Sequence, residues 1–324
     1  MHQLPNKTNS STSRRKFIKQ LSLSAVAIPF ASTGLTACAP NPPKEDLEVH
    51  LFSKHLQFLD IKTAAQRAVE MGFSGLDLTV RPKGHILPEN VTTELPKAIL
   101  DMKEVGASCK MIATAVEDAT NPLDIDVLKT AGEAGIEYYR CNWFKYPPDI
   151  SLEASLDYYQ KKIQELGVLN KKHNIIGCYQ NHSGTKVGAS VWEVKKILAT
   201  VDPAFFGAQY DIRHAVAEGG NSWTNGVKLL QNEIKTIVLK DFVWGQVNGK
   251  WKIVNVPIGE GMVDFPTYFK LLKSLELQPP VSLHVEYPLG GAEKGRSDIT
   301  VNPSVVFEAM KKDLERIQQL WKVA

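Results

Sequence analysis

Cysteine is scarce in this sequence. The 324 residues contain four cysteines, Cys38, Cys109, Cys141 and Cys178, and no two of them have C-x-x-C spacing. A disulfide framework or a zinc knuckle is therefore not expected, because both need paired or clustered cysteines. The three cysteines after residue 38 fall in or beside predicted strands, where we interpret them as small buried hydrophobic residues. One pair of them could still be oxidised outside the cytoplasm.

A large excess of charge of one sign is also missing. The formal net charge of the whole chain is +3, but residues 1–37 hold five lysines and arginines and no acidic residue, so subtracting five leaves −2 for the rest. Because no basic patch remains, nucleic acid is not an expected partner. After the N-terminal region, no apolar run is long enough for a membrane-spanning helix.

The N-terminal region has the features of an export signal. Residues 13–19, Ser-Arg-Arg-Lys-Phe-Ile-Lys, resemble a twin-arginine motif, and a short apolar stretch follows them. Residues 35–38, Leu-Thr-Ala-Cys, resemble a bacterial lipobox. We predict a signal peptide over 1–37, lipidation of Cys38 and a tether over 38–46. The protein would then be periplasmic and attached to the membrane only by its lipid anchor.

Residues 47–324 alternate strand-like and helix-like segments without an internal linker. Strands are predicted over 48–52, 75–80, 108–116, 136–143, 175–180, 206–211, 236–240 and 281–286. Helices are predicted over 61–71, 91–105, 123–134, 152–172, 191–200, 224–232, 265–275 and 303–321. Gly72, Gly106 and Gly135 follow three of these helices, as left-handed C-caps do.

This alternation predicts one (β/α)8 TIM barrel, because parallel strands need crossover helices and bury both faces. A doubly wound open sheet is the competing architecture, but no glycine-rich phosphate-binding motif follows the first strand. The connection 241–264 is unusually long and contains Asn248-Gly249, which predicts a hairpin forming a lid or wall over the barrel mouth.

Polar residues follow almost every predicted strand. They are Lys54 and His55, Arg81 and His85, Arg140 and Asn142, Gln180 and His182, Asp211 and His214, Lys240 and Asp241, and Glu286. In a TIM barrel these strand ends meet at one face, which carries the active site. So many ionisable groups cannot be desolvated without partners, which favours a polar site for a polyol, a metal or both.

Several segments resemble the xylose-isomerase-like family of sugar isomerases and epimerases. They are 180–184, 211–220, 238–241, 259–265 and Glu286. The resemblance implies a divalent ion such as Mg2+ or Mn2+, held by four ligands from successive strands, that polarises a sugar carbonyl. Gln180, Asp211 and Glu286 match three ligand positions, whereas Val238 stands where the family has a histidine.

These departures weaken the expected metal site. Two carboxylates and one amide would hold Mg2+ or Mn2+ weakly unless His182 or His214 took part. A glutamine at position 180 also removes one of two candidate bases. A one-base reaction is therefore expected rather than a symmetrical epimerisation, and one base is enough for β-elimination from a 3-keto-glycoside.

The predicted function is that of a sugar isomerase or epimerase acting on a non-phosphorylated sugar or keto-glycoside by proton abstraction next to a carbonyl, with or without metal assistance. Alternatives are a 3-keto-glycoside lyase and a sugar-binding lipoprotein without catalysis. The predicted catalytic residues are Glu286, His214 and Lys240, and the predicted substrate-binding residues are Lys54, Arg81, His85, Arg140, Asn142, His182 and Trp244.

Purely structural roles also fit some of these residues. His214 could simply pair with Asp211, and Lys240 could form an internal ion pair with Asp241. We expect a small-molecule carbohydrate as the binding partner, and the sequence does not determine the oligomeric state.

Overall fold

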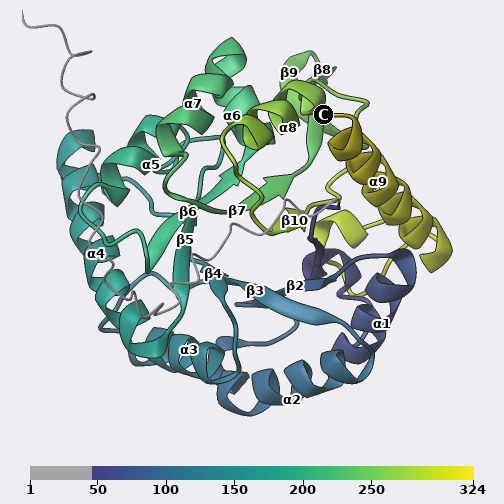
Figure 1. Cartoon of the computed structure of the whole chain (residues 1–324), viewed down its shortest axis with the longest axis horizontal. Coiled ribbons are helices and arrows are strands. Elements are labelled where there is room, and N and C mark those ends of the chain that lie inside the picture. Colours follow the sequence, from purple (N-terminus) through teal and green to yellow (C-terminus); the bar gives the residue numbers. More distant parts are fainter. Residues whose placement is uncertain (1–45) are drawn as a thin grey trace, which may run out of the picture. The chain divides into compact units, whose positions relative to one another are not determined.

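The computed structural model describes residues 46–324. The predicted signal peptide, Cys38 and the tether up to residue 45 lie outside the described residues. Eight parallel strands close into a barrel in the order β1-β10-β7-β6-β5-β4-β3-β2. Figure 1 shows the helices as a ring around these strands. The predicted (β/α)8 TIM barrel is confirmed.

The barrel strands are short. They are β1 (Val49–Phe52), β2 (Gly75–Val80), β3 (Ser108–Thr114), β4 (Tyr138–Arg140), β5 (Ile176–Gln180), β6 (Phe206–Asp211), β7 (Ile234–Leu239) and β10 (Val281–Leu283). The α-helices are α1 (Ile61–Met71), α2 (Val91–Glu104), α3 (Pro122–Glu133), α4 (Leu152–His173), α5 (Val191–Leu198), α6 (Ile212–Gly219), α7 (Trp223–Leu230), α8 (Phe265–Ser274) and α9 (Pro303–Val323).

Helix α6 was not among the helices predicted from the sequence, which placed the first helix after β6 at 224–232. The helix begins because the Asp211 side chain accepts a hydrogen bond from the His214 backbone N–H at 3.1 Å, as an N-cap does. Strand β10 is also shorter than predicted. Beyond Leu283, the backbone N–H of Val285 donates to His55 Nε2 at 3.0 Å instead of continuing the ladder.

Three helix ends are capped by glycine as the sequence predicted. The three expected cap glycines, Gly72, Gly106 and Gly135, have φ values of 100, 77 and 80°. An L side chain rarely adopts this backbone conformation, so glycine ends these helices at low cost. Asp60 caps the start of α1 by accepting the Thr63 N–H at 2.9 Å.

The barrel interior contains polar side chains below the mouth. Asp77 of β2 accepts a hydrogen bond of 2.6 Å from Ser282 of β10, and His50 of β1 lies 2.8 Å from Ser108 of β3. In each pair the two strands are separated by one strand of the barrel, so the side chains meet across its interior. TIM-barrel interiors are usually filled by branched apolar side chains. This barrel is therefore unusually polar along its axis.

The expected hairpin is present. Strands β8 (Asp241–Val247) and β9 (Lys250–Val256) pair antiparallel, and Asn248 and Gly249 turn between them with φ values of 53 and 72°. Cys109, Cys141 and Cys178 are free thiols, and the last two are buried. Over residues 46–324, no helix has the length and apolar character needed to cross a membrane.

Candidate active site

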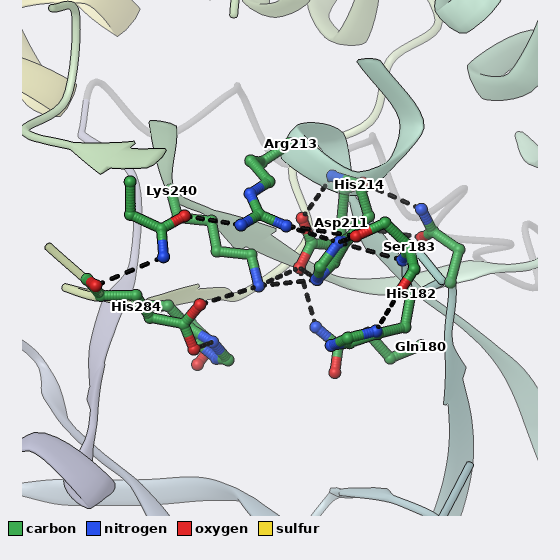
Figure 2. Close-up of polar contacts among 12 residues, drawn as sticks. Gln180, His182, Ser183, Asp211, Arg213, His214, Lys240 and His284 are labelled. Atoms are coloured by element: carbon green, nitrogen blue, oxygen red, sulfur yellow. Dashed lines mark hydrogen bonds and ion pairs between the residues drawn. The ribbon is translucent and has the colours of Figure 1, made fainter. Parts of the chain in front are cut away.

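Four ionisable side chains meet at the carboxyl ends of β6, β7 and β10. Asp211 ends β6, His214 lies in the first turn of α6, Lys240 follows β7 directly, and Glu286 lies three residues beyond β10. The pairing of Asp211 with Val238, and of Val238 with Ser282, sets these strand ends side by side. Figure 2 shows Lys240, Asp211 and His214 converging. We call Asp211, His214, Lys240 and Glu286 the acid–base cluster.

Lys240 lies at the centre of this cluster. Its Nζ is 3.1 Å from Asp211 Oδ2, 3.5 Å from Glu286 Oε2 and 2.8 Å from His214 Nε2. The side chains of Lys240 and Asp211 are 3% and 0% exposed, so water screens their attraction little. The predicted ion pair between Lys240 and Asp241 does not form. Asp241 instead accepts backbone N–H groups, among them those of Gly259 and Gly261 at 3.0 and 2.9 Å.

Glu286 is held between two ammonium groups. Lys54 Nζ lies 3.3 Å from its Oε1, on the side opposite the Lys240 contact. Burial by itself raises the pKa of Glu286, but Lys240 and Lys54 outweigh this and hold it well below its usual value. Glu286 is therefore ionised at neutral pH. Its side chain is still 22% exposed, so a substrate can reach the carboxylate.

His214 is neutral at neutral pH, because burial, and then the charge of Lys240, lowers its pKa well below the ordinary value. Its Nδ1 accepts the Ser183 backbone N–H at 3.1 Å, and its Nε2 faces Lys240. A neutral imidazole has one lone pair and cannot accept at both nitrogens. Arg213 Nη1, which can only donate, also lies 2.9 Å from Nδ1, so Nδ1 carries the lone pair and the ring hydrogen is on Nε2, 3.5 Å from Asp211 Oδ2. Such a ring is suited to proton transfer.

The residues predicted to bind a metal do not fit a divalent ion. Asp211 Oδ2 accepts the Gln180 side-chain amide at 2.8 Å and Lys240 Nζ at 3.1 Å, while Oδ1 accepts the His214 N–H. The Lys240 ammonium lies between the two carboxylates that would have to share the ion. Val238 is fully buried and offers no ligand atom. In residues 46–324, no three His, Cys, Asp or Glu side chains are grouped as a metal site requires.

Three further residues, which are not among the predicted site residues, hold this cluster in place. Asn181 accepts the Asp211 N–H at 2.8 Å and donates to the Asp211 carbonyl at 2.9 Å. Arg213 donates to Asn255 Oδ1 at 2.6 Å, and Asn255 in turn donates to the Glu286 carbonyl at 3.3 Å. Asn181 belongs to the segment 180–184 that carries the family resemblance, and this membership could have identified it as a site residue. Asn255 is on β9 and gave no signal, because only the folded hairpin brings it here.

The other side of the mouth is formed by β2 and β4. The Arg140 guanidinium carbon lies 4.1 Å from the Trp143 ring centroid, and this ring is 4.6 Å from the His182 ring. His182 is 4.0 Å from His214, which joins this side to the acid–base cluster. In the other direction, Arg81 lies 6.0 Å from the Phe52 ring. Phe52 stacks on His284 at 4.2 Å, so Arg81 is joined through two rings to the residue two positions before Glu286.

Three predicted substrate-binding residues contact side chains outside the acid–base cluster. His85 Nδ1 lies 3.1 Å from Ser53 Oγ and 3.3 Å from Thr79 Oγ1, and Asn142 donates to Glu117 at 2.9 Å. Trp244, on β8, is 44% exposed and contacts Phe242. The structure therefore brings Lys54, Arg81, Arg140 and His182 to the mouth. His85, Asn142 and Trp244 make no contact with the acid–base cluster within the described residues.

Comparison with family models matches residues 114–300 to the family described as xylose isomerase-like TIM barrel. No curated protein sequence matches the chain. Among solved structures, 3-keto-D-glucoside 4-epimerase from E. coli aligns with a TM-score of 0.61 at 11% identity, over 83% of this chain and 99% of that one.

Two further solved structures align equally well. A xylose isomerase-like TIM barrel protein from Mycobacterium smegmatis in complex with magnesium has a TM-score of 0.62 at 11% identity, over 86% of this chain and 98% of that one. D-psicose 3-epimerase from Clostridium cellulolyticum with D-tagatose has a TM-score of 0.61 at 11% identity, over 85% and 99%. At these identities the alignments establish a shared fold.

Proposed function

This chain belongs to the xylose isomerase-like TIM barrel family, and from that premise we propose that it is an enzyme that removes a proton from the carbon next to a sugar carbonyl. The acid–base cluster carries this proposal, because a carboxylate, an imidazole and an ammonium group lie in contact at the mouth. The substrate is a non-phosphorylated sugar or keto-glycoside. Solved structures of the same fold include two sugar epimerases, which supports this class of substrate.

In this proposal Glu286 is the base. A strongly lowered pKa makes a carboxylate a weak base, so the Lys240 contact has to loosen when substrate binds. A substrate carbonyl oxygen placed near Lys240 Nζ would take over one ammonium hydrogen from Glu286, and the pKa of Glu286 would then rise. The same hydrogen would stabilise the enolate oxygen as charge develops there. Stabilisation of this kind contributes about 10²–10³-fold in rate.

A β-elimination is a second candidate reaction, favoured by Gln180. This amide donates to Asp211 and cannot act as a second base. In the elimination, Glu286 takes the proton at C2 of a 3-keto-glycoside, the C–H electron pair forms the C1=C2 double bond, and the C1–O bond breaks. The leaving oxygen receives a proton from the Lys240–His214 pair, whose nitrogens are 2.8 Å apart. The products are an unsaturated ketone and an alcohol.

We further propose that the enzyme is exported and held at the membrane by a lipid on Cys38. The order of twin arginines, apolar stretch and Leu-Thr-Ala-Cys supports this location. Sugars outside the cytoplasm are largely free or glycosidic, which agrees with a non-phosphorylated substrate. Fractionation tests it: wild type should remain with membranes until detergent is added, whereas Cys38→Ser should be released without detergent. Equal release of both proteins would refute the lipid anchor.

Deuterium exchange tests the proton abstraction. When the wild-type protein is incubated with 3-keto-glucosides or with D-psicose in D2O, it should introduce deuterium at the carbon next to the carbonyl. NMR measures the rate of this exchange. Glu286→Gln should lower the exchange rate at least about 10²-fold with an unchanged circular dichroism spectrum. Glu260→Gln is the matched control, since Glu260 is exposed and lies outside the cluster. Exchange that persists in Glu286→Gln would reject Glu286 as the base, and sugar binding without exchange in wild type would favour a binding protein.

A further inference from the structure

Three buried hydrogen-bond donors on the β2–β4 side of the mouth lack an acceptor among the described residues. They are Arg81 Nε, Arg140 Nη1 and Trp143 Nε1. Arg140 is 95% buried, with 5% of its surface exposed, and within residues 46–324 its guanidinium makes one hydrogen bond, a long one of 3.5 Å from Nη2 to the Thr114 carbonyl. Buried polar groups in native proteins nearly always have partners, so this group of donors indicates a ligand.

The type of atom limits the chemistry of that ligand. Guanidinium and indole nitrogens donate hydrogen bonds and cannot accept them. Each matching ligand atom must therefore be an acceptor, and neutral hydroxyl groups would also bring hydrogens that find no acceptor on these three nitrogens. A carboxylate presents only acceptor lone pairs and matches the planar fork of a guanidinium.

Charge points in the same direction. Burial, together with the repulsion of Arg81, lowers the pKa of Arg140 to about 10, so the guanidinium remains charged at neutral pH. Asp77 is the acidic group whose charge acts on both arginines, but no ion pair within 4.0 Å joins it to either within residues 46–324. Burial raises the pKa of Asp77 to about 6, and Ser282 takes up one carboxyl oxygen at 2.6 Å. Two cations thus share one incomplete counterion.

The position of these donors fits a substrate that spans the mouth. Trp143 and His182 connect Arg140 to His214 through ring contacts of 4.1, 4.6 and 4.0 Å, and Lys240 follows at 2.8 Å. The acid–base cluster lies on the β6–β10 side and the free donors on the β2–β4 side of one mouth. A sugar held at one end by the arginines would present its other end to Lys240 and Glu286.

We propose that Arg140, assisted by Arg81 and Trp143, binds a carboxylate of the substrate, so that the sugar is a uronic acid, free or as a keto-glycoside, or a keto-aldonic acid. This assignment of the substrate class rests on the proposed function for the chemistry at the other end. Binding through the arginines is independent of turnover. A monoanionic carboxylate also matches the charge of two guanidiniums and one largely ionised aspartate better than a phosphate dianion does.

Calorimetry with matched sugar pairs tests the proposal. Wild type is titrated with D-glucuronate, D-galacturonate and D-gluconate, and with their uncharged counterparts D-glucose, D-galactose and D-glucitol. At least one acid should bind about tenfold or more tightly than its neutral partner, because a charge-assisted hydrogen bond is strong. Arg140→Met should abolish this preference, whereas Arg140→Lys should keep part of it. Arg67→Met, on the outer surface of α1, is the control and should keep all of it.

Three results would overturn the proposal. One is that no acid in the panel binds more tightly than its neutral partner. The second is that the preference survives Arg140→Met, with circular dichroism showing that the variant is folded. The third is that D-glucose 6-phosphate binds more tightly than D-glucuronate, which would identify the site as a phosphate site. Glu286→Gln separates this question from turnover, since it should lose deuterium exchange while keeping the preference for the acid.

Discussion

The two sides of the barrel mouth treat buried charge in opposite ways. On the β6–β10 side, Lys240 lies between Asp211 and Glu286, and each of these carboxylates also has a second partner. On the β2–β4 side, Arg140 is equally buried but has one long hydrogen bond. The first arrangement positions groups for chemistry before substrate arrives. The second costs folding free energy that a bound ligand would recover.

The largest expected effect comes from removing a carboxylate on the paired side. Asp211→Asn leaves the Lys240 ammonium buried with one carboxylate, and the loss of one partner from a buried ion pair costs about 3–5 kcal/mol. We expect urea unfolding to show a loss of this size. Asp60→Asn is the matched control, since Asp60 also caps a helix but is exposed, and asparagine caps equally well. Equal losses in both variants would mean that Asp211 acts only as a cap.

Acid should destabilise the protein through its buried histidines. Burial, the largest cause in each case, lowers the pKa of His182 to about 4 and those of His214 and His284 well below 6.5. Histidines of the unfolded chain take up protons near pH 6.5, whereas these buried histidines do so only at lower pH. Their contribution to the free energy of unfolding is therefore complete above pH 6.5 and is lost as the pH falls toward 4. The pKa of Asp77, raised to about 6, opposes this trend.

Burial also raises the pKa of Asp313, to about 7, and lowers those of His50 and His55 to about 4 and 3. The buried histidines outnumber these two opposing carboxyl groups, so the free energy of unfolding should fall between pH 6.5 and 4. Denaturant titrations at a series of pH values measure it. A free energy of unfolding that stays constant or rises over this range would show that the histidines are protonated in the folded protein.

A smaller effect of opposite sign is expected on the unpaired side. Arg140→Met removes a buried charge that has only one long hydrogen bond and the Trp143 ring to offset its burial among the described residues, so it should leave the protein equally stable or more stable by about 1 kcal/mol. Arg213→Met is the matched change on the paired side, where the guanidinium donates to Asn255 at 2.6 Å, and it should destabilise. Thermal unfolding of the two variants compares them directly. A destabilised Arg140→Met would show that this arginine is already satisfied in the folded chain.

The smallest effect is expected on the hairpin. Trp244 is 44% exposed and does not touch the acid–base cluster, so Trp244→Ala should change deuterium exchange by less than about twofold. Asn255, on the other strand of the same hairpin, joins Arg213 to the Glu286 carbonyl and should have a larger effect when changed to alanine. If Trp244→Ala is the more damaging variant, the hairpin tip closes over the substrate.

The sequence predicted the barrel because alternating periodicity and cap glycines are local properties. Strands β2 and β6 and helix α1 have the predicted boundaries. Helix α6 was missed because its N-cap, Asp211, was interpreted only as a site residue, although the same side chain serves both roles. Predicted ends of β4 and β10 were too long because loop and side-chain contacts replace the ladder there.

The site was only partly predictable. Their positions at or after predicted strand ends identified Asp211, Lys240 and Glu286. The same positions could not show that Lys240 lies between the two carboxylates, because the direction of a lysine side chain depends on the folded structure around it. The same limit applies to Asn255, which comes from an inserted hairpin. Exposure of Trp244 also depends on the direction of that hairpin, which the local turn sequence leaves undetermined.

The central claim is that the Lys240 ammonium takes the place between Asp211 and Glu286 that a divalent ion would need. Titration with Mn2+, followed by the electron paramagnetic resonance signal of the free ion, tests it without any substrate. Wild type should leave the free Mn2+ signal unchanged, and Lys240→Met should bind about one ion per chain, weakly, with Asp211→Asn removing it again. Stoichiometric Mn2+ binding by wild type that disappears in Asp211→Asn would contradict the account.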